Sequence, residues 1–167
     1  MLKRIVGLFS LFMLLGFYSL EAQKYVHSVG AVLGSNNGFS YKVYPSEEVG
    51  IQLELAQKFT YNTDFDGSFP MFSVDLTPHV MRHWQMKKQE WNFLMGGGCV
   101  IGYNWYLKSL EAFKFGIDLI TGFEYFAPDA PLVVQIDFRP GYSLLFKKYV
   151  YGACLDWGIN VGIRYAF

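Results

Sequence analysis

The sequence predicts an all-β fold, an eight-stranded antiparallel up-and-down transmembrane β-barrel, from three features of its residue pattern. Apolar and polar residues alternate through residues 155–167, and the apolar face ends in aromatic rings. Alternating segments of roughly ten residues recur along the chain, as in outer-membrane barrels. Bulky aromatic residues lie on the apolar face and small residues on the polar face, which suits a barrel whose outside meets lipid.

Eight segments carry this alternation, and turn-forming residues separate each from the next. A strand has a period of two, so each segment presents one apolar and one polar face. The predicted strands are 25–34, 38–44, 49–59, 69–84, 91–105, 113–125, 132–142 and 155–167. The connections at the periplasmic end are 45–48, 85–90 and 127–131, and the outer connections are 35–37, 60–68, 106–112 and 143–154.

Aromatic residues of the apolar face are predicted to form a belt at each end of the barrel, where rings that are part apolar and part polar prefer to lie. The periplasmic belt comprises Tyr25, Trp84, Trp91, Tyr125, Tyr165 and Phe167, and the outer belt Tyr103, Trp105, Phe113, Tyr142 and Trp157. A soluble barrel with its apolar face inside is the alternative. It is disfavoured because these rings are too bulky for the interior of eight strands.

The N-terminus has the pattern of a secretory signal peptide. Lys3 and Arg4 precede an apolar run, and Ala22 offers a cleavage point. We therefore expect a signal peptide at 1–22 and the barrel at 23–167. A retained membrane helix is the alternative, but the apolar run is shorter than the ~20 residues that span a bilayer. The chain has 14 basic and 14 acidic residues, so its charge gives no reason to expect a nucleic-acid partner.

Charged residues on the polar faces are predicted to lie inside the barrel, where an unpaired charge is costly. They are Lys42, Lys58, Lys114, Arg139, Arg164, Glu54, Asp75, Asp118, Glu124, Asp137 and Asp156. An eight-stranded interior is just wide enough for side chains, which favours a salt-bridge network that fills it over a proton or ion path. We expect Asp118 and Arg139 to pair within this network.

No catalytic, cofactor or metal site is predicted. Asp75, His79 and His83 share a face, but four residues along a strand span about 13 Å, too far for ligands of one metal. His27 and Ser28 are neighbours that point to opposite faces and cannot form a base–nucleophile pair. Cys99 and Cys154 lie on opposite faces by strand parity, so free thiols are expected.

Three segments then suggest a relationship. GIDLITGFEY at 116–125, APLVVQIDFRP at 130–140 and VGIRYAF at 161–167 resemble the small outer-membrane β-barrel proteins common in Bacteroidota, which are eight-stranded and similar to the barrel of outer membrane protein A. The resemblance implies that Val161, Ile163, Tyr165 and Phe167 form the signal read by the barrel-assembly machinery. Val32 departs from it, because a polar interior residue is expected there.

The expected protein is therefore a monomeric, integral barrel in the outer membrane of a Gram-negative cell, exported through a cleaved signal peptide. Its filled lumen favours a structural or surface-interaction role without catalysis or cofactors, with outer-membrane lipid and the assembly machinery as partners. A narrow, porin-like passive pore is the first alternative. A membrane-embedded lipid-modifying enzyme is less favoured, because His79 and His83 are predicted to face inward.

Overall fold

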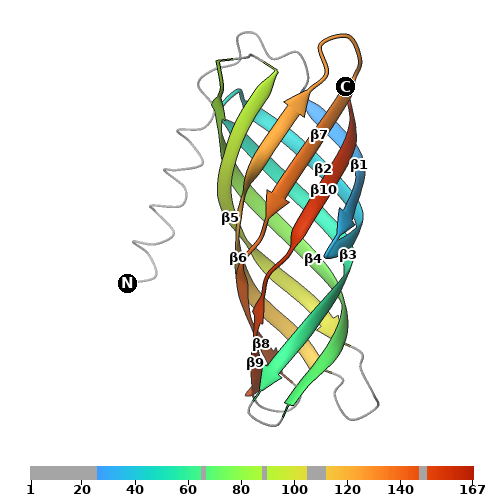
Figure 1. The fold of residues 1–167 in the computed structure, drawn as a ribbon, viewed down its shortest axis with the longest axis vertical. Coiled ribbons are helices and arrows are strands. Elements are labelled where there is room, and N and C mark those ends of the chain that lie inside the picture. Colours follow the sequence, from blue (N-terminus) through green and yellow to red (C-terminus); the bar gives the residue numbers. More distant parts are fainter. Residues whose placement is uncertain (1–25, 65–66, 88–89, 105–111, 147–149) are drawn as a thin grey trace.

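The computed structural model describes residues 26–64, 67–87, 90–104, 112–146 and 150–167, which form a closed antiparallel β-barrel (Figure 1). The predicted signal peptide lies outside the described residues. The strands of the barrel are β1 (His27–Gly34), β2 (Asn36–Ser46), β3 (Val49–Asp64), β4 (Gly67–Gln85), β5 (Trp91–Asn104), β6 (Ala112–Phe126), β7 (Leu132–Phe138), β8 (Gly141–Phe146), β9 (Val150–Asp156) and β10 (Ile159–Ala166). The described residues include no helix long and apolar enough to cross a membrane.

These ten elements form the eight strands of the barrel wall. β7 and β8 pair with β6 in one continuous register, so they form a single strand interrupted at Arg139 and Pro140. β9 and β10 likewise form one strand interrupted at Trp157 and Gly158. Proline has no N–H to donate, but Arg139 N–H still donates to the Gly158 carbonyl at 2.9 Å, so the two interruptions face each other across one ladder.

The barrel closes where β1 pairs with β10, and every other strand pairs with its neighbours in sequence. Following hydrogen-bonded partners from Ser28 around the wall leads to Asp156 on the last strand, whereas Ser28 itself pairs with Ala166 on that strand. This offset of ten residues is the stagger that closure requires, and it tilts the strands by about 40°. The predicted fold class is confirmed.

Exposure alternates along the strands as expected for a barrel that faces lipid. In β10, Ile159 is 60% exposed and Ile163 is 46% exposed. Arg164, which lies between the outward-facing Ile163 and Tyr165, is fully buried. Tyr25 of the predicted periplasmic belt and Trp105 of the outer belt lie outside the described residues. The other members of the periplasmic belt, Trp84, Trp91, Tyr125, Tyr165 and Phe167, gather at the end of the barrel that holds the C-terminus. There the ring centroids of Trp91 and Tyr125 lie 4.9 Å apart. The apolar side chains therefore lie outside and the charged ones inside.

Two predicted outer connections are wrong. β3 continues to Asp64 and β4 begins at Gly67, so most of 60–68 is strand. Residues 143–154 were expected to form a loop, but β8 continues to Phe146 and β9 begins at Val150. A strand that extends past the apolar belt no longer needs a lipid-facing side. Its residue pattern therefore loses the alternation that marks strands within the membrane.

The hairpin between β1 and β2 is much shorter than the others. β1 has 8 residues, whereas β3 has 16 and β4 has 19. Its turn is tight, because Gly34 adopts a positive φ of 133° and β2 already begins at Asn36. β1 ends near the middle of the barrel, while β3 and β4 run on to the end opposite the C-terminus, called here the far end (Figure 1).

Replacing Gly30 with valine is expected to reduce the folded fraction strongly. A Cβ atom at Gly30 would lie 2.6 Å from the backbone Cα of Arg164 on β10, so a side chain there forces β1 and β10 apart at the closing ladder. Overpacking of this kind costs about 1–3 kcal/mol or more. Ala31→Val is the matched control, since Ala31 faces outward on the same strand. Heat-modified mobility on gels measures the folded fraction, and equal loss in both variants would contradict this account.

Candidate functional site

The most distinctive chemistry of the molecule is its enclosed set of charged side chains. All nine residues of the predicted network point into the barrel and are at most 6% exposed: Lys42, Glu54, Asp75, Lys114, Asp118, Glu124, Asp137, Arg139 and Arg164. Lys58, Asp156, His79 and His83 join them. The strand period puts all of them on the inward face, and burial then requires each charge to find a partner.

At the C-terminal end of the barrel the network centres on Glu124 of β6. Lys42 donates to its Oε1 at 2.6 Å, and the Tyr44 hydroxyl donates to the same oxygen at 3.0 Å. His83 Nε2 lies 3.2 Å from Oε2, and Arg164 Nη1 lies 3.7 Å from Oε1. One carboxylate therefore meets two cations, a hydroxyl and an imidazole, and these groups come from three other strands, β2, β4 and β10.

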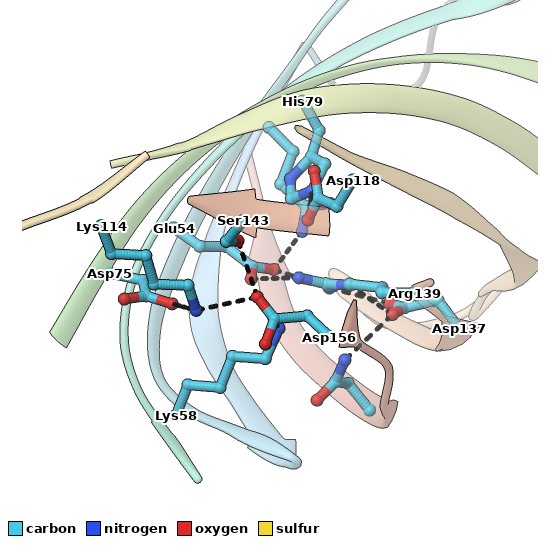
Figure 2. A network of polar contacts seen from close by, with 12 residues as sticks. Glu54, Lys58, Asp75, His79, Lys114, Asp118, Asp137, Arg139, Ser143 and Asp156 are labelled. Atoms are coloured by element: carbon cyan, nitrogen blue, oxygen red, sulfur yellow. Dashed lines mark hydrogen bonds and ion pairs between the residues drawn. The ribbon is translucent and has the colours of Figure 1, made fainter. Parts of the chain in front are cut away.

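In the middle of the barrel Arg139 holds two carboxylates at once (Figure 2). Its Nη1 and Nη2 donate to the two carboxylate oxygens of Glu54, and its Nε donates to Asp137 at 2.5 Å. Gln52 donates to Glu54, and Asn160 donates to Asp137 at 3.3 Å. The guanidinium fork suits such paired contacts, and it ties β3 to the opposite wall of the barrel.

A third group lies toward the far end. Lys114 Nζ is 2.9 Å from Asp75 and 2.9 Å from Asp156, and the Ser143 hydroxyl donates to Asp156 at 2.8 Å (Figure 2). Lys58 Nζ lies 3.7 Å from Asp156. Sequence reasoning missed Ser143 because residues 143–154 were assigned to a loop. Continuing the period of two from residue 141 would have placed it inside.

The expected pairing of Asp118 with Arg139 is wrong, because Asp118 pairs with His79 at 2.9 Å. The reason lies in the strand between them. His79 of β4 is opposite Gly98 of β5, and Gly98 is opposite Asp118 of β6. A Cβ atom at Gly98 would lie 2.8 Å from the His79 ring, so the glycine lets the imidazole reach past β5 to the carboxylate.

Several buried polar atoms have no hydrogen-bond partner within the described part of the chain. At the far end these are Ser73 Oγ, Asp75 Oδ1 and Asn104 Nδ2. A buried donor or acceptor without a partner is expensive and calls for an explanation. These three belong to neighbouring strands, β4 and β5, and Ser73 is directly opposite Asn104.

The structure does not assemble a site from the residues considered for catalysis or metal binding. Among the described residues, no group of three His, Cys, Asp or Glu side chains is placed to hold a metal ion. His79 and His83 both lie in the interior. His27 Nδ1 instead shares a hydrogen bond of 2.7 Å with the Tyr41 hydroxyl near the barrel end. Both cysteines are free thiols, as predicted.

A closed barrel with an apolar outside, aromatic rings at its end and a charged interior defines a transmembrane β-barrel. The chain is similar to the N-terminal β-barrel domain of Pseudomonas aeruginosa OprF, with a TM-score of 0.62 and 10% identity over 84% of this chain and 96% of that one. Neisserial surface protein A has a TM-score of 0.48 and 15% identity over 84% and 94%. The sequence matches no family profile and no curated protein. The likeness to the OprF domain shows the fold.

Replacing Arg139 with methionine is expected to lower the free energy of unfolding by about 3–5 kcal/mol, because Glu54 and Asp137 are left buried without their cation. Urea unfolding in lipid vesicles, followed by tryptophan fluorescence, measures the change. Arg82→Met is the matched control. Its pair with Glu48 is 2.7 Å long but exposed on both sides, so the loss should stay within about 1 kcal/mol. Similar losses in the two variants would contradict a stabilising core of ion pairs.

Proposed function

We propose that this protein is an integral outer-membrane barrel with a structural or surface-interaction role, no catalytic centre and a lumen closed to solutes. The observation that carries the proposal is the set of buried ion pairs around Glu124, Arg139 and Asp156, which form three groups along the lumen. Their side chains occupy an interior that, in eight strands, has room for little else. Such a barrel therefore interacts with other molecules at its outer surface and at its ends.

The far end is the part that supports a surface role. A strand tilted by about 40° rises about 2.5 Å per residue along the barrel axis, so the 19 residues of β4 cover roughly 45 Å. The apolar band of an outer-membrane barrel is about 25 Å tall. The hairpins β3–β4 and β8–β9 therefore have enough length to extend beyond the membrane, where they can contact other surfaces. We place this end outside the cell.

The last strand supports a role in assembly for Val161, Ile163, Tyr165 and Phe167. All four are exposed on the lipid-facing side, and the Phe167 ring stacks on that of His27 with 5.7 Å between centroids. Phe167 also exchanges two backbone hydrogen bonds with His27, at 2.8 and 3.0 Å. The C-terminal residue thus completes the seal between the first and last strands. We propose that the assembly machinery recognises this strand before β1 closes on it.

The closed lumen makes a direct prediction for planar-bilayer recording. The wild-type barrel is expected to show no stable conductance, which separates this proposal from a passive pore. Glu54→Ala with Arg139→Ala removes the ion pair across the middle of the lumen and should produce measurable conductance. Glu48→Ala with Arg82→Ala removes an equivalent pair on the surface and should leave the barrel closed. A stable solute-sized conductance in the wild type would overturn the closed lumen.

Phe167→Ala is expected to reduce the amount of barrel assembled in cells several-fold while leaving refolding into detergent nearly unchanged. The ring is proposed to act during recognition, whereas the backbone bonds to His27 remain. Phe138→Ala is the matched control, because it removes an equally large ring that is 41% exposed on the lipid-facing side. Quantifying folded protein in membrane fractions decides the matter. If assembly falls equally in both variants, the C-terminal ring has no special role.

A further inference from the structure

The backbone ladder of the barrel stops early beside the short β1–β2 hairpin. From His27 to Gly34 the chain makes seven steps, or about 17 Å along the axis at ~2.5 Å per residue. The apolar band to be crossed is about 25 Å tall. The turn at Ser35 therefore lies below the outer boundary of that band, while the neighbouring strands β3 and β9 continue past it (Figure 1).

At the turn, hydrogen bonds that include side chains join the β1–β2 hairpin to the last strand. Ser35 N–H donates to the Ile159 carbonyl at 3.1 Å, and the Ile159 N–H donates to Ser35 Oγ at 3.2 Å. Asn36 N–H donates to the Asn160 side chain at 2.8 Å. Gly158 makes this possible, because a Cβ atom there would lie 2.6 Å from Ser35 Oγ. The end of the hairpin is thus firmly attached to the last strand.

Beyond the turn, β3 and β9 face each other without a ladder. In the described residues β3 pairs only with β4 after Lys58, and β9 pairs only with β8. Some Cα atoms of the two strands approach within 8 Å, yet the strands are not hydrogen-bonded. We call this line between residues 58–64 and 150–156 the seam. The part of the seam next to the turn lies within the apolar band, and unpaired backbone groups there are costly unless another polar group satisfies them.

The ion pair that spans the seam is the loosest contact in the far-end group. Lys58 Nζ and Asp156 Oδ2 are 3.7 Å apart, which is longer than a hydrogen bond. Asp156 is held independently by Lys114 at 2.9 Å and by Ser143 at 2.8 Å. Asp156 therefore keeps its compensation if Lys58 turns to another anion. Breaking this pair leaves no buried carboxylate unpaired.

Lys58 is the first of three residues with hydrogen-bond donors that lie opposite one another on adjacent strands. In the strand register Lys58 of β3 is opposite Ser73 of β4, and Ser73 is opposite Asn104 of β5. All three side chains face inward and are at most 4% exposed. Ser73 Oγ and Asn104 Nδ2 have no hydrogen-bond partner among the described residues. Lys58 and Ser73 are about 5 Å apart across the ladder, so their ammonium and hydroxyl groups can both donate to one phosphate group beside the seam.

The outside of the seam is strongly apolar. Phe59 on β3 is 60% exposed, Leu155 on β9 is 66% exposed, and Trp157 just below it is 70% exposed. Phe39 on β2, next to the short turn, is 74% exposed. An acyl chain lying along these side chains would remain in the membrane while its polar head reached the seam.

We propose that the seam binds one lipid of the outer leaflet through an anionic, phosphate-bearing head. The head contacts Lys58 and the neighbouring Ser73 in place of the Lys58–Asp156 pair, and supplies polar atoms to the unpaired strand edges. The acyl chains lie on Phe59, Leu155 and Trp157. This inference goes beyond the proposed role and rests on it only for the placement of the barrel in a membrane.

Electron paramagnetic resonance of spin-labelled lipids tests the proposal with the full chain reconstituted in phosphatidylcholine vesicles. Spin-labelled phosphatidylglycerol is expected to associate more strongly than spin-labelled phosphatidylcholine. Lys58→Gln should abolish this preference, by about tenfold in relative association, the loss expected for one charge-assisted hydrogen bond. Lys58→Arg should retain it. Lys87→Gln, which removes an exposed cation at the opposite end, is the matched control.

Asp156→Asn provides a variant with the opposite expected effect, since it removes the carboxylate that competes for Lys58 and should strengthen association of the anionic lipid. Heat-modified mobility confirms that each variant is folded before it is compared. Equal association of the two lipids with the wild type, or a preference unchanged in folded Lys58→Gln, would overturn the site. Conductance of the wild type would instead refute the closed lumen and leave the lipid preference standing, so the two failures are distinguishable.

Discussion

Charges that cannot reach water are the constraint on which this structure depends. With the outside of the barrel given to lipid, each ionic side chain on the inward face must be neutralised by another from the same narrow interior. The strongest pairs cross the full width of the tube. Lys42 of β2 meets Glu124 of β6, and Arg139 of the β7–β8 strand meets Glu54 of β3. In each case three strands separate the partners in both directions around the wall, so these pairs brace opposite sides of the barrel.

The parts of this arrangement that a sequence can predict are those governed by the period of two. Alternation placed Glu54, Arg139 and Arg164 on the inward face because one face of each strand met lipid. Where the strands leave the apolar band that rule no longer operates. Residues 60–64 and 143–146 were therefore assigned to loops although they continue β3 and β8. The interior role of Ser143 was missed for the same reason, since a loop has no inward face.

Partner choice was less predictable than direction, because it depends on the ten-residue stagger of the closed barrel. Which residues meet across the lumen follows from that stagger, and a single sequence does not contain it. His79 and Asp118 meet because Gly98 lies between them on the intervening strand, and Arg139 then binds Glu54 and Asp137. A glycine in mid-strand is the local signal that two side chains on either side can touch.

The ionic contacts of the network differ in length, and the long contact made by Lys58 bears on the seam. Arg139 makes direct hydrogen bonds to two carboxylates in the middle of the lumen, whereas Lys58 at the seam has an ion pair too long for a hydrogen bond. Lys114 lies between them and holds Asp156 without help from Lys58. A polar head that engaged Lys58 would therefore leave the central braces intact. The wall can therefore exchange an ionic partner at the seam while the lumen behind the seam stays closed.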